Sequence, residues 1–248
     1  WGKDNFPVKL NDDGTLDKSA EFIEKTKNGL GGIAYVNFSL TPHESVKYTN
    51  ALQRYIRENT RLGIPLLMFV ECIFGEIAVE ATRFPFQIGM AATWNPELVR
   101  QVYDAVGKEV RSRGGNMTMT PVLDIGRDPR WGRIQETFGE DTYLASVLGV
   151  AAVKGFQGGD DLKPDHIAAT LKHFAGFAQS QGGRQLAPGD ISHRTFIDEI
   201  LPSFKAAVTE ANAAAVMLSY TEIDGVPCHA NKWLINDILR DQWGFNGV

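Results

Sequence analysis

The chain has 248 residues, of which 43% are hydrophobic and 22% are charged, as in an ordinary soluble globular protein. Its formal net charge of −5 argues against nucleic acid as a partner, because phosphate binding requires a basic face. No apolar window approaches the roughly 18 residues that a membrane-spanning helix needs. Cys72 and Cys228 are too few for a disulfide framework, so we expect two buried free thiols.

The N-terminal part of the chain predicts a strand followed by a well-capped helix. The β-rich run lies at residues 33–38. Thr41 and Glu44 then have the spacing of a capping box, and Pro42 occupies the first helical position. We expect this helix to present one apolar side and to end near Gly63.

The same alternation of strand and helix continues to the end of the sequence. Asn95 is expected to cap a helix that ends at Gly114 and Gly115. The other expected strands span 64–70, 117–125, 167–174 and 213–219, and the other expected helices span 142–156, 192–211 and 232–243. Residues 245–248 have the character of an approach to one more strand.

Strands that alternate with helices predict a mainly parallel sheet, either a (β/α)₈ barrel or a doubly wound open sheet. Nucleotide-binding open sheets need a glycine-rich turn after the first strand, whereas the early glycine cluster at 29–32 precedes its strand. We therefore expect an α/β fold with a TIM-like barrel, residues 1–248 forming a single domain. Only about five strands and the start of a sixth are visible, so the barrel is expected to be incomplete at its C-terminal end.

Charged and aromatic residues stand where the expected strands end, which is where barrels carry their function. These residues are Glu71, Asp124, Lys172, His173 and Tyr220. Their mixture of carboxylates and cations suits a polyhydroxylated ligand, and Trp131 could stack on a sugar face. Neighbours on a strand point to opposite faces, so Lys172 and His173 reach one ligand only if the backbone is distorted between them.

Other polar residues are expected to have structural roles. Arg127 and Asp128 are interpreted as members of loop ion pairs, and His166 is expected at the surface. We expect no metal, because the sequence has neither Cys/His ligand spacing nor a calcium loop. The absence of a Gly-x-Ser-x-Gly motif gives no support to serine hydrolase chemistry.

Several of these segments together resemble glycoside hydrolase family 3. The segment GRDPRWGR at 126–133, followed by FGED at 138–141, resembles the signature of the family. Further agreement comes, in order, from KHFAG at 172–176, VMLSY at 216–220 and LRDQWGFNG at 239–247. The resemblance covers roughly residues 60–248. It implies a retaining exo-β-glycosidase with an N-terminal TIM-like barrel and no cofactor, acting on the terminal non-reducing β-linked sugar of oligosaccharides.

The resemblance also implies which residues bind the sugar. They are Glu71, Arg133, Lys172, His173 and Tyr220 around the terminal sugar, Met217 lining the pocket, and Arg184 as an additional pocket residue. The acid matched to Glu71 is often Asp in the glucosidases of the family, while Glu is common in xylosidase-like members, whose sugar lacks the C6 arm. A β-glucosidase is thus the leading interpretation, and a β-xylosidase is the alternative.

The two bond-breaking carboxylates are not assigned to this sequence by the resemblance. The nucleophilic Asp of the family follows a Gly-Phe-Asp-Gly-Val-Val segment, and here the chain reads GFNGV at 244–248 and ends. The nucleophile, the general acid and later domains are therefore expected in a remaining C-terminal part of the same enzyme. A glycoside substrate is the other expected partner, with no nucleic acid and no membrane.

Two further hypotheses remain open at this stage. One is a non-catalytic sugar-binding relative, which would keep the pocket and lack the chemistry. The other is an aminosugar glycosidase of the same family, although the His-containing loop motif of those enzymes is not found. A secreted or periplasmic location is slightly favoured.

Overall fold

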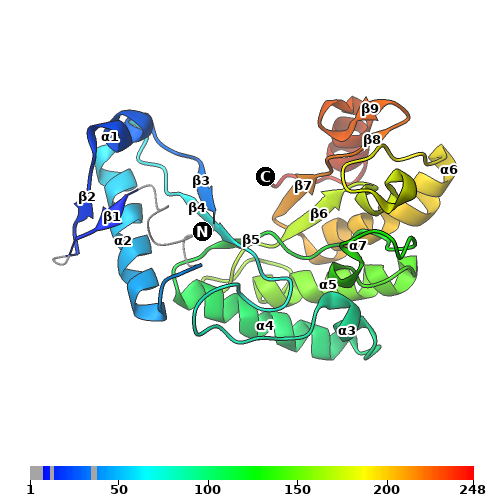
Figure 1. Ribbon diagram of the computed structural model, residues 1–248, viewed down its shortest axis with the longest axis horizontal. Coiled ribbons are helices and arrows are strands. Elements are labelled where there is room, and N and C mark those ends of the chain that lie inside the picture. Colours follow the sequence, from blue (N-terminus) through cyan, green and yellow to red (C-terminus); the bar gives the residue numbers. More distant parts are fainter. Residues whose placement is uncertain (1–7, 12–13, 35–37) are drawn as a thin grey trace.

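The computed structural model describes residues 8–11, 14–34 and 38–248, which form two lobes (Figure 1). The N-terminal lobe begins with the short antiparallel pair β1 (Lys9–Leu10) and β2 (Leu16–Asp17), followed by α1 (Ala20–Thr26) and α2 (Pro42–Asn59). Its core has apolar side chains from α1, α2, β4 (Leu67–Val70) and the residue before β4: Phe22, Tyr48, Leu52, Tyr55, Ile56, Leu66 and Met68. Of the elements of this lobe, the sequence predicted α2 but not β1, β2 or α1.

Five parallel strands carry the rest of the fold. β3 (Gly32–Ala34) pairs with β4 (Leu67–Val70), and β4 pairs with β5 (Met117–Thr118). β6 (Thr170–Phe174) pairs with β7 (Ala215–Leu218), and parallel bridges from Met117 to Ala168 and from Val122 to Lys172 join the β5 segment to β6. The order is therefore β3-β4-β5-β6-β7, which confirms the predicted α/β class with parallel strands.

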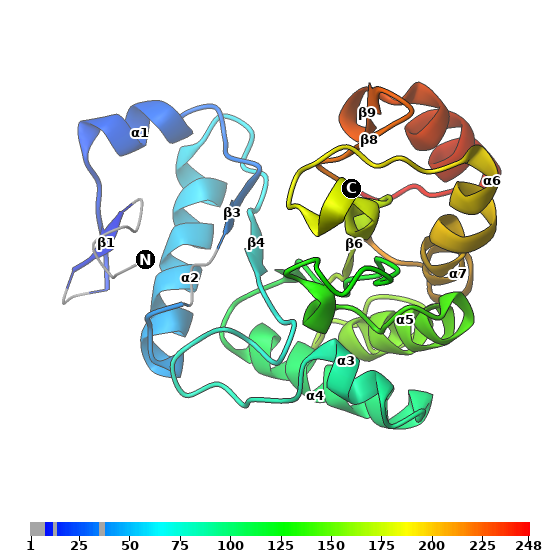
Figure 2. The same ribbon diagram turned by 45° about the vertical axis from the view of Figure 1, so that its right-hand side comes forward.

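A helix follows each of these strands and covers the outer side of the sheet. α4 (Pro96–Ser112) packs against α5 (Thr142–Gln157), and α5 packs against α7 (Leu201–Ala211), as Figure 2 shows. Glycine permits the close approach of α5 to α4, because a Cβ at Gly155 would lie 2.5 Å from the carbonyl oxygen of Arg100. Tyr103 and Phe156 fill the same interface with ring centroids 4.5 Å apart.

The predicted helix starts are confirmed in detail. Thr41 and Glu44 form both bonds of a capping box with Pro42 in the first turn, and Asn95 and Ser192 cap their helices through side-chain oxygens. The helix opened by Ser192 consists of α6 (His193–Thr195), a π-helical segment (Phe196–Ile200) and α7. The final helix is also π-helical and spans Trp233–Gln242.

The predicted strands are shorter in the structure than in the sequence interpretation. Of the strand expected at 33–38, residues 35–37 lie outside the described residues. The strand expected at 117–125 is regular only over Met117–Thr118, and beyond it Val122 forms an isolated parallel bridge with Lys172. At the chain end, Val248 donates to the Ala214 carbonyl at 3.1 Å and accepts from the Val216 N–H at 2.9 Å, so 245–248 approach β7.

The remaining elements are small. α3 (Gln87–Ala91) lies in the long segment before α4, and β8 (Glu222–Ile223) pairs with β9 (Val226–Pro227) beyond β7. Cys72 and Cys228 are both buried free thiols, as predicted. None of the helices that the structure describes is long and apolar enough to cross a lipid bilayer.

Candidate functional site

A buried ion pair that spans β5, from the end of β4 to β6, forms one side of the site. Glu71 follows β4 directly, and Lys172 lies within β6. The Nζ atom of Lys172 lies 2.5 Å from Oε2 of Glu71, and the two residues are 3% and 8% exposed. An ammonium group has three N–H donors, so this pair leaves Lys172 able to donate to a ligand as well.

The Glu71 carboxylate is held on its other oxygen too. Oε1 accepts from the Thr120 hydroxyl at 2.6 Å and from the backbone N–H of Cys72 at 3.0 Å. The carboxylate is thus fixed from β4, from the segment after β5 and from β6. Burial raises the pKa of the adjacent Cys72 thiol well above its ordinary value, so this cysteine is protonated at neutral pH and is a poor nucleophile.

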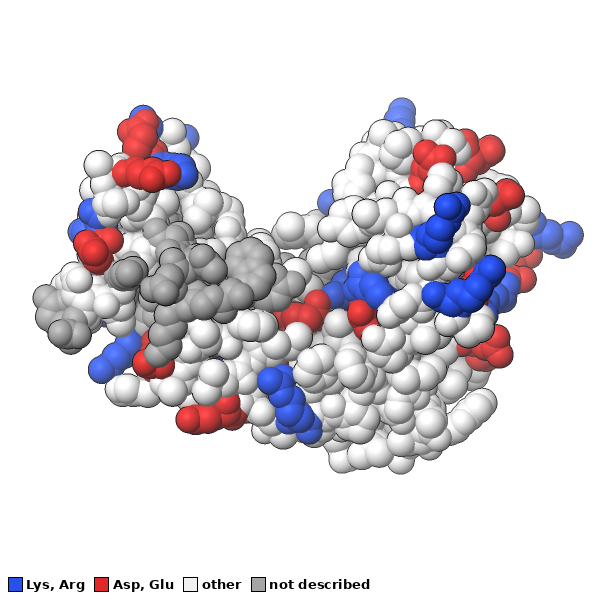
Figure 3. All heavy atoms as spheres, in the orientation of Figure 1, with Lys and Arg blue, Asp and Glu red and all other residues white. Residues whose placement is uncertain are grey.

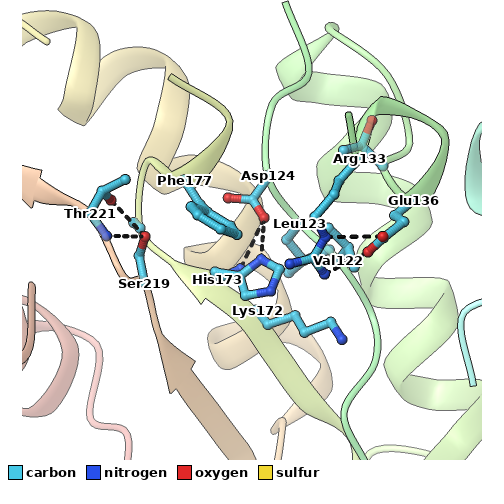
Figure 4. Close-up of polar contacts among 12 residues, drawn as sticks. Val122, Leu123, Asp124, Arg133, Glu136, Lys172, His173, Phe177, Ser219 and Thr221 are labelled. Carbon is cyan, nitrogen blue, oxygen red and sulfur yellow. Dashed lines mark hydrogen bonds and ion pairs between the residues drawn. The ribbon is translucent and has the colours of Figure 1, made fainter. Parts of the chain in front are cut away.

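His173 is held by Asp124 from the segment after β5. Oδ2 of Asp124 lies 2.7 Å from Nδ1 of the ring and accepts from the backbone N–H of His173 at 3.1 Å (Figure 4). The Lys172–His173 peptide bond is cis, and the register between β6 and β7 shifts between Leu171 and Phe174. The β6 backbone is thus irregular at Lys172 and His173, which is the condition under which both side chains could reach one ligand.

Arg133 reaches the same place from the loop between β5 and α5. It forms two parallel bonds to Glu136, from Nε at 3.0 Å and from Nη2 at 2.6 Å. Burial opposes the charge of Arg133, but the bonds to Glu136 outweigh it and raise the pKa of the guanidinium above its ordinary value. The guanidinium also lies over the ring of Phe177, 5.5 Å from its centroid, and is always cationic.

Phe177 is the aromatic centre of the site, although no sequence motif singled it out. Its ring meets His173, Trp131 and Tyr220 edge to face, at centroid distances of 4.6, 5.5 and 5.8 Å. Phe177 is fully buried, so its ring forms a fixed support against which these side chains pack. The only available signal was its position four residues after His173.

The predicted site residues differ in how closely the structure assembles them. Glu71, Lys172, His173 and Arg133 are brought together, and Tyr220 joins them through Phe177 while remaining 66% exposed. Met217 lies in β7 and is half-buried. Arg184 is exposed and donates from Nε to the Gln181 carbonyl at 3.4 Å, so no described contact ties it to this cluster.

Two expectations about side-chain exposure were wrong. Trp131 is 1% exposed and packs on Phe177, so it cannot stack on a sugar. His166 is 4% exposed, because its ring is bonded by Asp165 at 2.7 Å and Asp104 at 3.0 Å. In both cases the side chain lies in a polar stretch of sequence and is buried by tertiary contacts.

The predicted ion pairs of the 126–133 loop are confirmed. Arg127 pairs with Glu199, and Asp128 pairs with Arg130 at 2.7 Å. These pairs hold the loop that carries Arg133. In the space-filling view, acidic and basic atoms meet at the floor of the hollow between the two lobes (Figure 3).

Comparison with known proteins assigns the fold and site to a family. The profile named "Glycosyl hydrolase family 3 N terminal domain" matches residues 15–248. The chain belongs to glycosyl hydrolase family 3. It is 45% identical over 245 residues to a protein of Formosa agariphila named "Putative beta-xylosidase", covering 98% of this chain and 32% of that protein.

Other family 3 relatives agree in sequence and in structure. A "Periplasmic beta-glucosidase" of Salmonella typhimurium is 36% identical over 197 residues, which are 79% of this chain and 25% of that protein. A solved β-glucosidase from Erythrobacter marinus superposes with a TM-score of 0.89 at 42% identity, over 91% of this chain and 31% of that one. The chain thus spans about a quarter to a third of the length of the relatives it matches.

Proposed function

We propose that the protein is a retaining exo-acting β-glycosidase, a β-glucosidase that hydrolyses the terminal non-reducing β-linked sugar of oligosaccharides. One observation carries this proposal. Side chains from β4, from β6 and from the loop after β5 meet in one polar cluster beside the C-terminal ends of parallel strands. That edge is where (β/α)₈ barrels carry their active sites. A TIM-like barrel with residues 1–248 as one domain is part of the proposal.

The cluster has the donors and acceptors that a sugar ring requires. Lys172 and Arg133 donate to hydroxyl oxygens, and Glu71 accepts from hydroxyl groups. The paired carboxylate and ammonium are fixed before substrate binds, so little side-chain freedom is lost on binding. Tyr220 contributes its exposed ring at the rim, with Met217 and Arg184 as the outer members of the proposed pocket.

Bond cleavage in this proposal uses carboxylates from the C-terminal remainder of the enzyme. A retaining glycosidase needs a nucleophile and a general acid about 5–5.5 Å apart. Within this chain, Asp124 is 1% exposed and is bonded to His173, so the proposal gives it no role as the nucleophile. The described residues accordingly supply sugar binding, and the remaining chain is the protein partner that supplies the attack and the proton.

A β-xylosidase is the second candidate, and Glu71 is the observation that favours it. Its carboxylate is held on both oxygens, so it cannot retreat to make room for a C6 hydroxymethyl group. Two relatives from Formosa agariphila, at 45% and 40% identity, carry β-xylosidase names. A shorter acid at this position would enlarge the pocket by about one methylene group.

Hydrolysis of nitrophenyl β-glucoside and β-xyloside by the full-length protein tests both candidates. We expect hydrolysis of at least one, and we expect Glu71→Asp to raise the glucoside-to-xyloside ratio of kcat/KM. A methylene in a pocket changes such ratios by roughly 10- to 200-fold. Calorimetric binding of glucose or xylose without turnover of either glycoside would overturn the enzymatic proposal in favour of a non-catalytic sugar-binding protein.

A secreted or periplasmic location is part of the same proposal. It is supported by the relative that is named a periplasmic β-glucosidase. Fractionation of the native host with an antibody against the protein would test it, and a purely cytosolic signal would contradict it.

A further inference from the structure

We propose that Asp124 is a positioning residue that fixes the ring orientation and the tautomer of His173, so that Nε2 is the atom presented to the substrate. Its kinetic part rests on the proposed function. Its structural part, the protonation of the ring, can be measured without any substrate.

Among the residues that the structure describes, His173 is the hydrogen-bond partner of Asp124. It is 1% exposed, and its Oδ2 atom takes both the ring Nδ1 at 2.7 Å and the backbone N–H at 3.1 Å. The other oxygen, Oδ1, is buried and has no hydrogen-bond partner among the residues that the structure describes. Burying a carboxylate costs several kcal/mol unless its partners compensate, so a purely structural role would be better filled by a neutral residue.

The backbone bond alone has a structural explanation. The register shift between Leu171 and Phe174 leaves the N–H of His173 outside the regular β6–β7 ladder, and a buried N–H needs an acceptor. An asparagine carbonyl would satisfy that N–H equally well. The charge of Asp124 is therefore explained by the second bond, to the imidazole ring.

That second bond decides the state of the ring. A carboxylate only accepts, so the nitrogen facing it at 2.7 Å must carry the proton. In the neutral ring Nε2 is then an acceptor, and in the charged ring it is a donor. Phe177 lies edge to face with the same ring at 67° and is itself fully buried, which blocks rotation.

The Nε2 atom of His173, which Asp124 does not bind, lies on the side of the ring that faces the other site residues. Figure 4 shows the His173 ring between Asp124 on one side and the Lys172 chain on the other, with Arg133 beside it. The charged groups around His173 are the carboxylates of Asp124 and Glu71 and the cations of Lys172 and Arg133. Without the carboxylate of Asp124, no acceptor would select the tautomer of the ring.

The variant Asp124→Asn tests the proposal in the full-length protein. Its carbonyl can accept the backbone N–H of His173, so the fold is expected to persist, while the charge is lost. A charge-assisted bond is worth roughly tenfold to a hundredfold, and we expect kcat/KM to fall by about that factor. We also expect the pH profile of kcat/KM to differ from that of the wild type, because a charge beside the ring has been removed.

The chain contains a matched control. Asp165 lies 2.7 Å from Nδ1 of His166, the same distance as in the proposed pair, but before the start of β6 rather than within it. We expect Asp165→Asn to leave kcat/KM and its pH profile unchanged. An equal loss in both variants would indicate a general effect on folding and would overturn the proposal.

Nitrogen-15 NMR of ring-labelled histidine in the substrate-free protein gives the deciding readout. His173→Gln identifies the signal, and we expect a protonated Nδ1 in the wild type and a mixture of tautomers in Asp124→Asn. A wild-type ring with unprotonated Nδ1, or an unchanged ring and pH profile in the variant, would overturn the proposal. Failure of the proposed function appears separately, as a wild-type protein that hydrolyses no glycoside.

Discussion

Replacing Lys172 with methionine would leave the Glu71 carboxylate buried without its cation. At an N–O separation of 2.5 Å, the attraction in the native pair is about 7 kcal/mol for an effective dielectric constant near 20. Desolvation of both ions offsets most of that attraction in the intact pair. Removing one ion abolishes the attraction but not the desolvation of the other, which costs about 3–5 kcal/mol.

Two hydrogen bonds to Glu71 remain in Lys172→Met, so its loss of unfolding free energy should lie at the lower end of that range. The Thr120 hydroxyl and the Cys72 N–H still donate to the carboxylate, so we expect a loss of about 3 kcal/mol. For a domain of this size that is about 6–12 °C in the unfolding midpoint. Differential scanning calorimetry of the full-length protein measures it, from the transition of this domain.

A double variant separates stability from function. Because two apolar side chains can replace a buried pair at little cost, Glu71→Leu combined with Lys172→Met should recover most of the lost stability. It should not recover glycoside hydrolysis. Lys154→Met is the control, since Lys154 pairs with Asp160 at 2.8 Å on the surface, where an ion pair contributes little. An unchanged midpoint in Lys172→Met, or a double variant less stable than both singles, would refute this reasoning.

Three further variants test other contacts. Phe177→Ala should lower stability by about 3–5 kcal/mol and should reduce kcat/KM more than Phe177→Leu does, because the ring supports the site residues from beneath. Gly155→Ala should lower the unfolding midpoint, since its Cβ would meet a backbone carbonyl of α4 at 2.5 Å, whereas Gly31→Ala meets nothing within 4 Å and should not. The hydrogen bond from His166 lowers the pKa of Asp165 below its ordinary value of 3.8. The bond therefore stabilises the fold fully above pH 3.8, and this stabilisation is lost as the pH falls through the lower pKa of the folded protein. Asp165→Asn should therefore lower the urea midpoint slightly at neutral pH, and the gap from wild type should close below pH 3.8; a constant gap would contradict this assignment.

The parts of the fold predicted from sequence are those governed by local chemistry. Thr41, Asn95 and Ser192 cap their helices because a side-chain oxygen meets an N–H only a few residues away. Strand ends could not be placed as well. The regular part of β5 ends at Thr118, although Val122 still bridges Lys172, because strand pairing depends on partners far away in sequence.

The site residues also fall into those that local sequence predicts and those that depend on tertiary packing. Glu71, Lys172 and His173 were predictable because they stand at or near the ends of apolar strand runs. The burial of Trp131 and His166 was not, because it depends on what packs over them. Phe177 was missed for that reason too. An aromatic residue at the start of a short 3₁₀ helix gives no sequence signal that it contacts four other side chains.

The Glu71–Lys172 pair joins residues 101 positions apart in the chain. β5 lies between their two strands, so the pair can form only when β4, β5 and β6 have all docked in one alignment. A one-residue slip of β6 would place Leu171 or His173 opposite the carboxylate and would bury it beside a group that cannot neutralise it in the same way. The Glu71–Lys172 pair thus also discriminates against misaligned sheets, and variants that remove it should populate alternative strand registers during refolding.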